Sequence, residues 1–101
     1  MKWILALLQI FVKTLTVTVN IDLRLQTVKG YIDGMKVLNI SNFGSSFVHN
    51  VWKFKIELTE GVFLLSYNGV VIYSTTQYQN ISILYHDKQL SVNGFVIPFK
   101  F

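Results

Sequence analysis

The sequence predicts an all-β fold, an antiparallel β-sandwich of the jelly-roll type preceded by a short apolar N-terminal segment. From residue 14 onward, apolar and polar residues alternate with a period of two, which is typical of half-buried strands. Turn residues interrupt the chain every ~8–12 residues, as they do in sandwiches. The chain has 101 residues, 51% of them hydrophobic and 14% charged. This composition suits one folded domain and is too apolar for a disordered chain.

The first residues have the features of a secretory signal peptide. Lys2 is followed by an apolar stretch over residues 3–12 that only Gln9 interrupts. The stretch is too short to span a bilayer, which takes ~20 apolar residues, but it fits the ~7–15 residues of a signal-peptide core. We therefore expect residues 1–18 to be a signal peptide or an uncleaved signal anchor, and residues 19–101 to form a single β-sandwich domain. The alternative is an N-terminal helix or strand that packs into the fold.

The first predicted strand overlaps the end of this segment. Between Thr14 and Gln26, apolar residues alternate with polar ones without a break, which predicts a strand with one buried and one wet face. No A-x-A cleavage motif is present, and the small pair Thr16 and Thr18 would place cleavage near Val19. Because such cleavage would remove the first third of the strand, both interpretations stay open.

Turn and strand signals define the middle of the chain. Lys29-Gly30 and Asp33-Gly34 predict turns, a strand is expected over 35–40, and the Gly- and Ser-rich stretch 41–46 indicates a loop. A further strand is predicted over 51–58. Its inward-facing residues would be Trp52, Phe54, Ile56 and Leu58.

A β-hairpin is predicted after a turn over residues 59–61. The pair Asn68-Gly69 separates the apolar runs 62–67 and 70–73. Asn-Gly favours a type I′ turn because both central residues need a positive φ. Both strands are apolar on both faces, so we expect them to lie centrally in the sheet stack.

Short strands and polar connections alternate in the last third. They are a loop over 74–80, a strand over 81–85, a turn over 86–88, a strand over 89–92 and a turn at Asn93-Gly94. The final strand is expected over 95–101. Pro98 has no N–H to donate, so this strand should lie at a sheet edge.

Residues that carry enzyme chemistry are few. The absence of Cys excludes thiol catalysis and thiolate metal sites. His49 and His86 lack the sequence context of a catalytic base and nucleophile, and Glu57 and Glu60 are expected on a wet strand face and in a turn. No Gly-rich phosphate-binding motif is present. We expect no catalytic residue, no metal site and no cofactor, and a protein that is not an enzyme.

The charge distribution does not suit nucleic acid. Nine basic and five acidic residues give a net charge of +4, but the basic residues are scattered, whereas nucleic-acid binders gather them on one face. Lys53 and Lys55 are expected to share one solvated strand face. Membrane contact is expected only through an uncleaved N-terminal segment.

Two sequons agree with a secretory route. Asn39-Ile40-Ser41 and Asn80-Ile81-Ser82 both match the N-glycosylation pattern. With the signal-like start, they predict a secreted or extracellular glycoprotein that carries glycans on Asn39 and Asn80.

Aromatic side chains are the candidates for ligand binding. A large ring with a polar group can stack on a sugar or anchor a protein partner. We select Tyr78, Trp52 and Tyr73, of which Tyr78 is expected to be best exposed because it lies in a polar loop. For Trp52 the alternative is core packing, since Phe54 and Ile56 follow it at a spacing of two.

Four segments of the second half follow a recognisable order. They are Phe54-Lys-Ile-Glu-Leu58, Gly61-Val-Phe-Leu-Leu-Ser-Tyr-Asn-Gly69, Ile81-Ser-Ile-Leu84 and Gln89-Leu-Ser-Val92. This half resembles a galectin-like or concanavalin-like lectin domain, in which an F-x-I-x-V-type strand precedes an F-x-V-x-V-N-G hairpin and two further strands. The resemblance implies a jelly-roll fold. Of the galectin sugar-binding motif, only an Arg, Arg24, is present.

Two functions remain. The first is a secreted, non-enzymatic, lectin-like module that binds a glycan without metal, through an open sheet face and an exposed Tyr. The alternative is a structural or protein–protein interaction β-domain that acts as a subunit of an assembly, including a homo-oligomer. The low charge and high apolar content support the alternative because they leave little polar surface for a domain of this size.

Overall fold

The computed structural model describes residues 14–76 and 80–101, and within them it contains strands and connecting turns but no helix. The ten strands are β1 (Thr16–Asp22), β2 (Thr27–Ile32), β3 (Met35–Ser41), β4 (Phe47–Val51), β5 (Phe54–Thr59), β6 (Val62–Tyr67), β7 (Val70–Thr75), β8 (Ile81–His86), β9 (Gln89–Val92) and β10 (Phe95–Val96). In this part of the chain, therefore, no helix exists that could cross a membrane.

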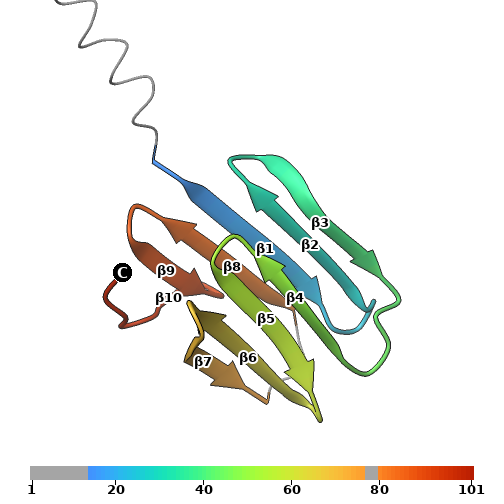
Figure 1. The fold of residues 1–101 in the computed structure, drawn as a ribbon. Helices are drawn as coiled ribbons and strands as arrows, with labels where there is room; N and C mark the ends of the chain where they lie inside the picture. Colours follow the sequence, from blue (N-terminus) through green and yellow to red (C-terminus); the bar gives the residue numbers. More distant parts are fainter. Residues whose placement is uncertain (1–13, 77–79) are drawn as a thin grey trace, which may run out of the picture.

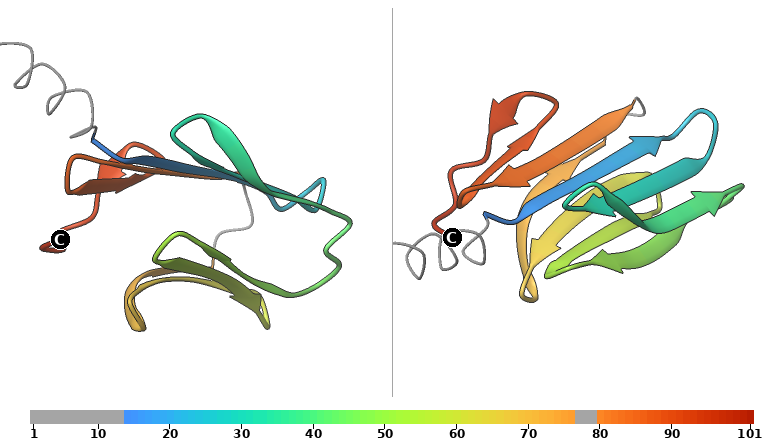
Figure 2. Two further views of the ribbon diagram at one scale, coloured as in Figure 1. Left: turned by 45° about the horizontal axis from the view of Figure 1, so that its top comes forward. Right: turned by 90° about the horizontal axis from the view of Figure 1, so that it is seen from above.

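The strands form two stacked antiparallel sheets (Figure 1). A six-stranded sheet has the order β10-β9-β8-β1-β2-β3, and a four-stranded sheet has the order β4-β5-β6-β7. Figure 2 shows the two layers from the side, joined by the connection between β3 and β4. The predicted antiparallel β-sandwich is confirmed.

The core lies between the two layers. Alternation along β1 turns Val17, Val19 and Ile21 inward, where each is at most 2% exposed. β5 and β6 contribute Phe54 and Leu65 from the facing layer. Burial of one such side chain stabilises the fold by ~1.5–3 kcal/mol, so the alternation seen in the sequence also supplies the main stabilising force.

Four tight turns lie where the sequence predicts them. Both residues have a positive φ in Asp33-Gly34, Glu60-Gly61, Asn68-Gly69 and Asn93-Gly94. This is the geometry that type I′ hairpin turns require. The hairpin of β6 and β7 is therefore confirmed, together with the turn before the last strand.

The first strand is shorter than predicted. It ends at Asp22 because Oδ1 of this residue accepts hydrogen bonds from the N–H groups of Arg24 at 3.0 Å and Leu25 at 2.9 Å, which turns the chain. The predicted signal peptide falls mainly on residues 1–13, which lie outside the described residues. Cleavage near Val19 would remove the buried Val17 and the start of β1.

Two other predictions about the positions of turns are wrong. Lys29-Gly30 is not a turn but lies inside β2, where a Cβ on Gly30 would come within 3.0 Å of Cγ2 of Val51. The predicted strand 51–58 is broken, because Trp52 has a φ of 57° and forms a hairpin turn with Lys53. Lys53 therefore does not share a strand face with Lys55.

The sheet edges also differ from expectation. β7 is an edge strand rather than a central one, and Val70 and Val71 are each 55% exposed. β10 is the expected edge strand, but it comprises two residues only. After it the chain leaves the sheet, and Ile97 is buried in the core while Phe99 and Phe101 pack against it. Figure 2 shows this end approaching the four-stranded layer.

Candidate ligand-binding site

Two of the aromatic residues chosen from the sequence, Trp52 and Tyr73, lie in different parts of the structure. Trp52 lies in the turn between β4 and β5 and is 36% exposed. Tyr73 lies in β7, two strands away from β5, and is partly buried against the core. Tyr78 lies outside the described residues. The structure therefore gives no common surface to Trp52 and Tyr73.

Trp52 belongs to an aromatic cluster at the end of the sandwich. Its ring centroid lies 5.2 Å from that of Tyr85, and Nζ of Lys53 lies 5.1 Å from the ring. Tyr85 in turn contacts Phe101, at 5.2 Å between centroids, and Phe101 contacts Tyr67 at 4.9 Å. Such aromatic pairs stabilise the packing of the two sheets, so the main role of Trp52 in this structure is packing.

Burial gives one residue of this cluster an altered acidity. The pKa of Tyr85 is raised above 10.0, first because burial disfavours the phenolate, and then because of the charges of Tyr67 and Asp87. A small hollow of about 280 Å³ opens beside Trp52 and Tyr85. Its lining is mixed and includes Asp87 and Lys88.

A larger hollow lies on the outer face of the six-stranded sheet. It measures about 570 Å³. The polar side chains that line it are Asn20, Asp22, Thr27, Lys29, Tyr31, Asn80 and Ser82. Three apolar residues line it as well, namely Leu25 in the turn after β1, Ile21 and Ile81.

The strand register explains why these side chains meet. Asn20 lies between the buried Val19 and Ile21, so it points outward. It is paired across the ladder with Lys29 of β2 on one side and with Ser82 of β8 on the other. Ser82 and Lys29 come from segments more than fifty residues apart, and β1 holds them in one row.

The hydrogen bonds and ion pairs of this row leave some of its polar groups free to bind a ligand. Oγ of Ser82 donates to Oδ1 of Asn20 at 3.2 Å. Within residues 14–76 and 80–101, no carboxylate lies within 4.0 Å of Nζ of Lys29. Nζ of Lys36 lies 5.9 Å from the centre of the Tyr31 ring. The hollow thus presents an ammonium, a carboxylate, two amides, hydroxyls and an aromatic ring.

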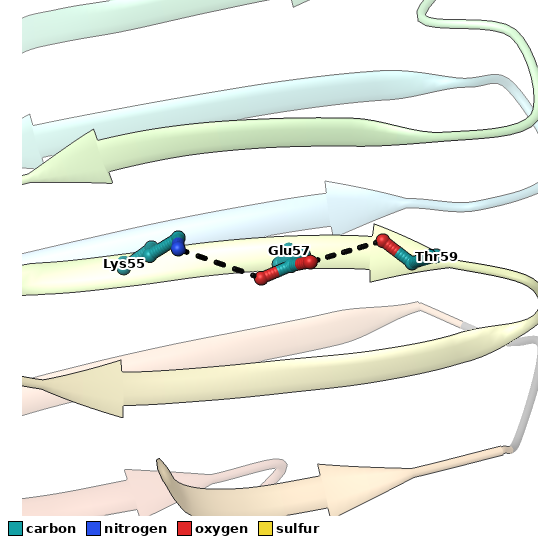
Figure 3. A network of polar contacts seen from close by, with 3 residues as sticks. All are labelled: Lys55, Glu57 and Thr59. Carbon is teal, nitrogen blue, oxygen red and sulfur yellow. Dashed lines mark hydrogen bonds and ion pairs between the residues drawn. The ribbon is translucent and has the colours of Figure 1, made fainter. Parts of the chain in front are cut away.

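The outer face of the four-stranded sheet is different. On β5, Nζ of Lys55 lies 3.7 Å from Oε1 of Glu57, and Oγ1 of Thr59 donates to Oε2 of Glu57 at 3.1 Å (Figure 3). Glu57 is therefore occupied by its neighbours, and Glu60 lies apart from it in the following turn. The two carboxylates do not flank a common cleft.

Both histidines contact other residues of the two sheets. Nδ1 of His86 lies 2.8 Å from Oγ1 of Thr16, across the pair of β8 and β1. The ring of His49 is stacked 6.1 Å from that of Phe47. The described part of the chain contains no group of three or more His, Cys, Asp or Glu side chains placed to hold a metal ion.

Of the residues that line the large hollow, sequence reasoning selected only Asn80, and only as a glycosylation site. Alternation along residues 14–26 does predict that Asn20 and Asp22 face solvent. It does not predict that β8 lies beside β1, because pairing between segments sixty residues apart leaves no local pattern. The sequence also predicts a turn at Lys29-Gly30, so it does not indicate that Lys29 and Tyr31 belong to one strand.

Comparison of the chain with protein-family models, with characterised proteins and with solved structures gave no significant match. What is established is therefore the antiparallel β-sandwich. The function has to be argued from the hollow itself.

Proposed function

We propose that this protein is a secreted, non-enzymatic, lectin-like module that binds a saccharide in the hollow on the outer face of the six-stranded sheet. The observation that carries the proposal is the row Ser82, Asn20 and Lys29, with Tyr31 beside it, in an open hollow of about 570 Å³.

The chemistry of the hollow suits a ligand rich in hydroxyl groups. A sugar hydroxyl both donates and accepts hydrogen bonds, and the amide of Asn20 and the hydroxyl of Ser82 can do the same. Lys29 is a donor only, and the Tyr31 ring offers an apolar face with a polar tip.

A glycan array with two matched variants tests the proposal. We expect the unmodified chain, produced in a bacterial host so that it carries no N-linked glycan, to bind a subset of glycans. Asn20→Ala should weaken that binding by about tenfold, since a lost hydrogen bond is worth ~1 kcal/mol and leaves its partner unpaired. Lys55→Ala, on the opposite outer face, is the control and should bind as the unmodified chain does.

Two results would contradict this function. One is an array on which no glycan binds above background. The other is equal weakening by Asn20→Ala and Lys55→Ala in variants that keep the β-sheet circular dichroism of the unmodified chain.

A second candidate function is favoured by the exposed edge of the four-stranded sheet. Val70 and Val71 of β7 are each 55% exposed, and an uncovered edge strand can pair with a strand of another chain. A second copy of this chain is the simplest occupant, and the protein would then act as a subunit. Light scattering after size exclusion tests this. A monomer at all concentrations would exclude the homo-oligomer.

A further inference from the structure

The second sequon lies in the hollow. Ile81 is 3% exposed and points into the core, so its neighbours Asn80 and Ser82 point to the outer face. Both are exposed and both line the hollow. Ser82, the third residue of the sequon, is also the residue that bonds Asn20.

The first sequon lies on the same face but outside the hollow. Asn39 is exposed on the edge strand β3 and is paired in register with Lys29. It is not among the residues that line the hollow. Because Asn39 lies directly beside Lys29, a glycan on Asn39 could also shield this lysine, so the test below removes Asn39 from both proteins.

We propose that an N-linked glycan on Asn80 covers the hollow, so that glycosylation at this residue decides whether the hollow is open to other ligands. Nδ2 of Asn80 would lose one proton and bond to C1 of the first sugar. The bond from C1 to a lipid-linked diphosphate donor would break, and the diphosphate would leave with the proton. The consequence for ligand binding rests on the proposed function, but the covering itself does not.

The geometry places the row of polar groups within reach of such a glycan. Lys29 lies on β2, two strands from β8. Adjacent strands are ~4.8 Å apart, so this is a lateral distance of about 10 Å. Asn20 lies between them on β1. A glycan attached to Asn80 would therefore contact the same side chains that an external sugar would need for binding.

Amine labelling tests the covering without any external ligand. The full chain, with its own N-terminus, is produced in a eukaryotic host as Asn39→Gln and as the double variant Asn39→Gln/Asn80→Gln. Each folded protein is treated with an amine-acetylating reagent, and the acetylation of Lys29 relative to Lys55 is measured by mass spectrometry. Lys55 lies on the other outer face and serves as the internal reference.

We expect Asn39→Gln to carry a glycan on Asn80 and to show severalfold lower relative labelling of Lys29 than the double variant. Enzymatic removal of the glycan from the folded Asn39→Gln protein should restore the labelling, which guards against a folding defect of the double variant. An unmodified Asn80, or equal labelling of Lys29 in both proteins, would overturn the inference.

The same two proteins separate this inference from the proposed function. On the glycan array, the double variant should bind and Asn39→Gln should not. If neither binds, the proposed function fails, while the labelling of Lys29 still decides whether the glycan covers the hollow. If both bind equally, the gating role is refuted although the saccharide site stands.

Discussion

The two outer faces of the sandwich carry similar residues but arrange them differently. On the four-stranded sheet, Lys55, Glu57 and Thr59 follow one another along β5 and bond to one another. On the six-stranded sheet, Lys29 and Asn20 come from different strands and line an open hollow. Polar residues on a strand face therefore do not by themselves indicate a binding site.

The two faces differ in whether their charged side chains already have partners within the protein. The carboxylate of Glu57 is shared between two neighbours of its own strand, so a ligand would have to displace them. Lys29 has no carboxylate partner among the described residues, so a ligand gains a donor without breaking an ion pair. This difference assigns the candidate site to the six-stranded sheet.

The largest effect is expected when a buried leucine is compared with an exposed one. Leu65 of β6 is 0% exposed, and Leu84, on the outer face of β8, is 44% exposed. Leu65→Ala should lower the free energy of unfolding by ~2–5 kcal/mol because it leaves a cavity, whereas Leu84→Ala should stay below about 1 kcal/mol. Urea denaturation measures both. Equal losses would mean that the face of β8 is not an outer face.

A pH-dependent effect is expected at the end of the sandwich where both sheets meet. Burial raises the pKa of Tyr85 above 10.0, so the folded chain holds this proton more tightly than the unfolded chain. The contribution of Tyr85 to the free energy of unfolding should be fully present below pH 10. It should be lost as the pH rises through the folded-state pKa. Tyr85→Phe should flatten this decline in urea denaturation across the alkaline range. An unchanged decline in the variant would refute the assignment to Tyr85.

The smallest effect is expected on the four-stranded face. Lys55 is 49% exposed in its ion pair with Glu57, and exposed ion pairs contribute ~0–1 kcal/mol. Lys55→Ala should therefore change the free energy of unfolding by less than about 1 kcal/mol. A larger loss in urea denaturation would show that the Lys55, Glu57 and Thr59 network is structural, and Lys55→Ala would then be a poor control for binding.

The sequence predicts the fold well where a local pattern determines it. Asn68-Gly69 marks its hairpin because few residue pairs tolerate two positive φ angles in succession. Alternation predicts the buried faces of β1 and β5 because successive side chains point to opposite faces. These features depend only on neighbouring residues.

Predictions fail where contacts distant in sequence decide the structure. The sequence predicts Gly30 in a turn, but Gly30 lies inside β2, where a Cβ would make a tight contact of 3.0 Å with Cγ2 of Val51. Trp52 fits the alternation of β5, yet it adopts a positive φ and turns the chain. The hollow depends on the pairing of β1 with β8, which no local pattern records.

Mapping of the bound ligand tests the saccharide site most directly. Backbone amide shifts of the ¹⁵N-labelled chain are followed during titration with a glycan selected on the array. The account predicts that the largest shifts occur at Asn20, Lys29, Tyr31 and Ser82, while Lys55 and Glu57 stay unchanged. Shifts centred on β5, or on Trp52 at the end of the sandwich, would contradict it.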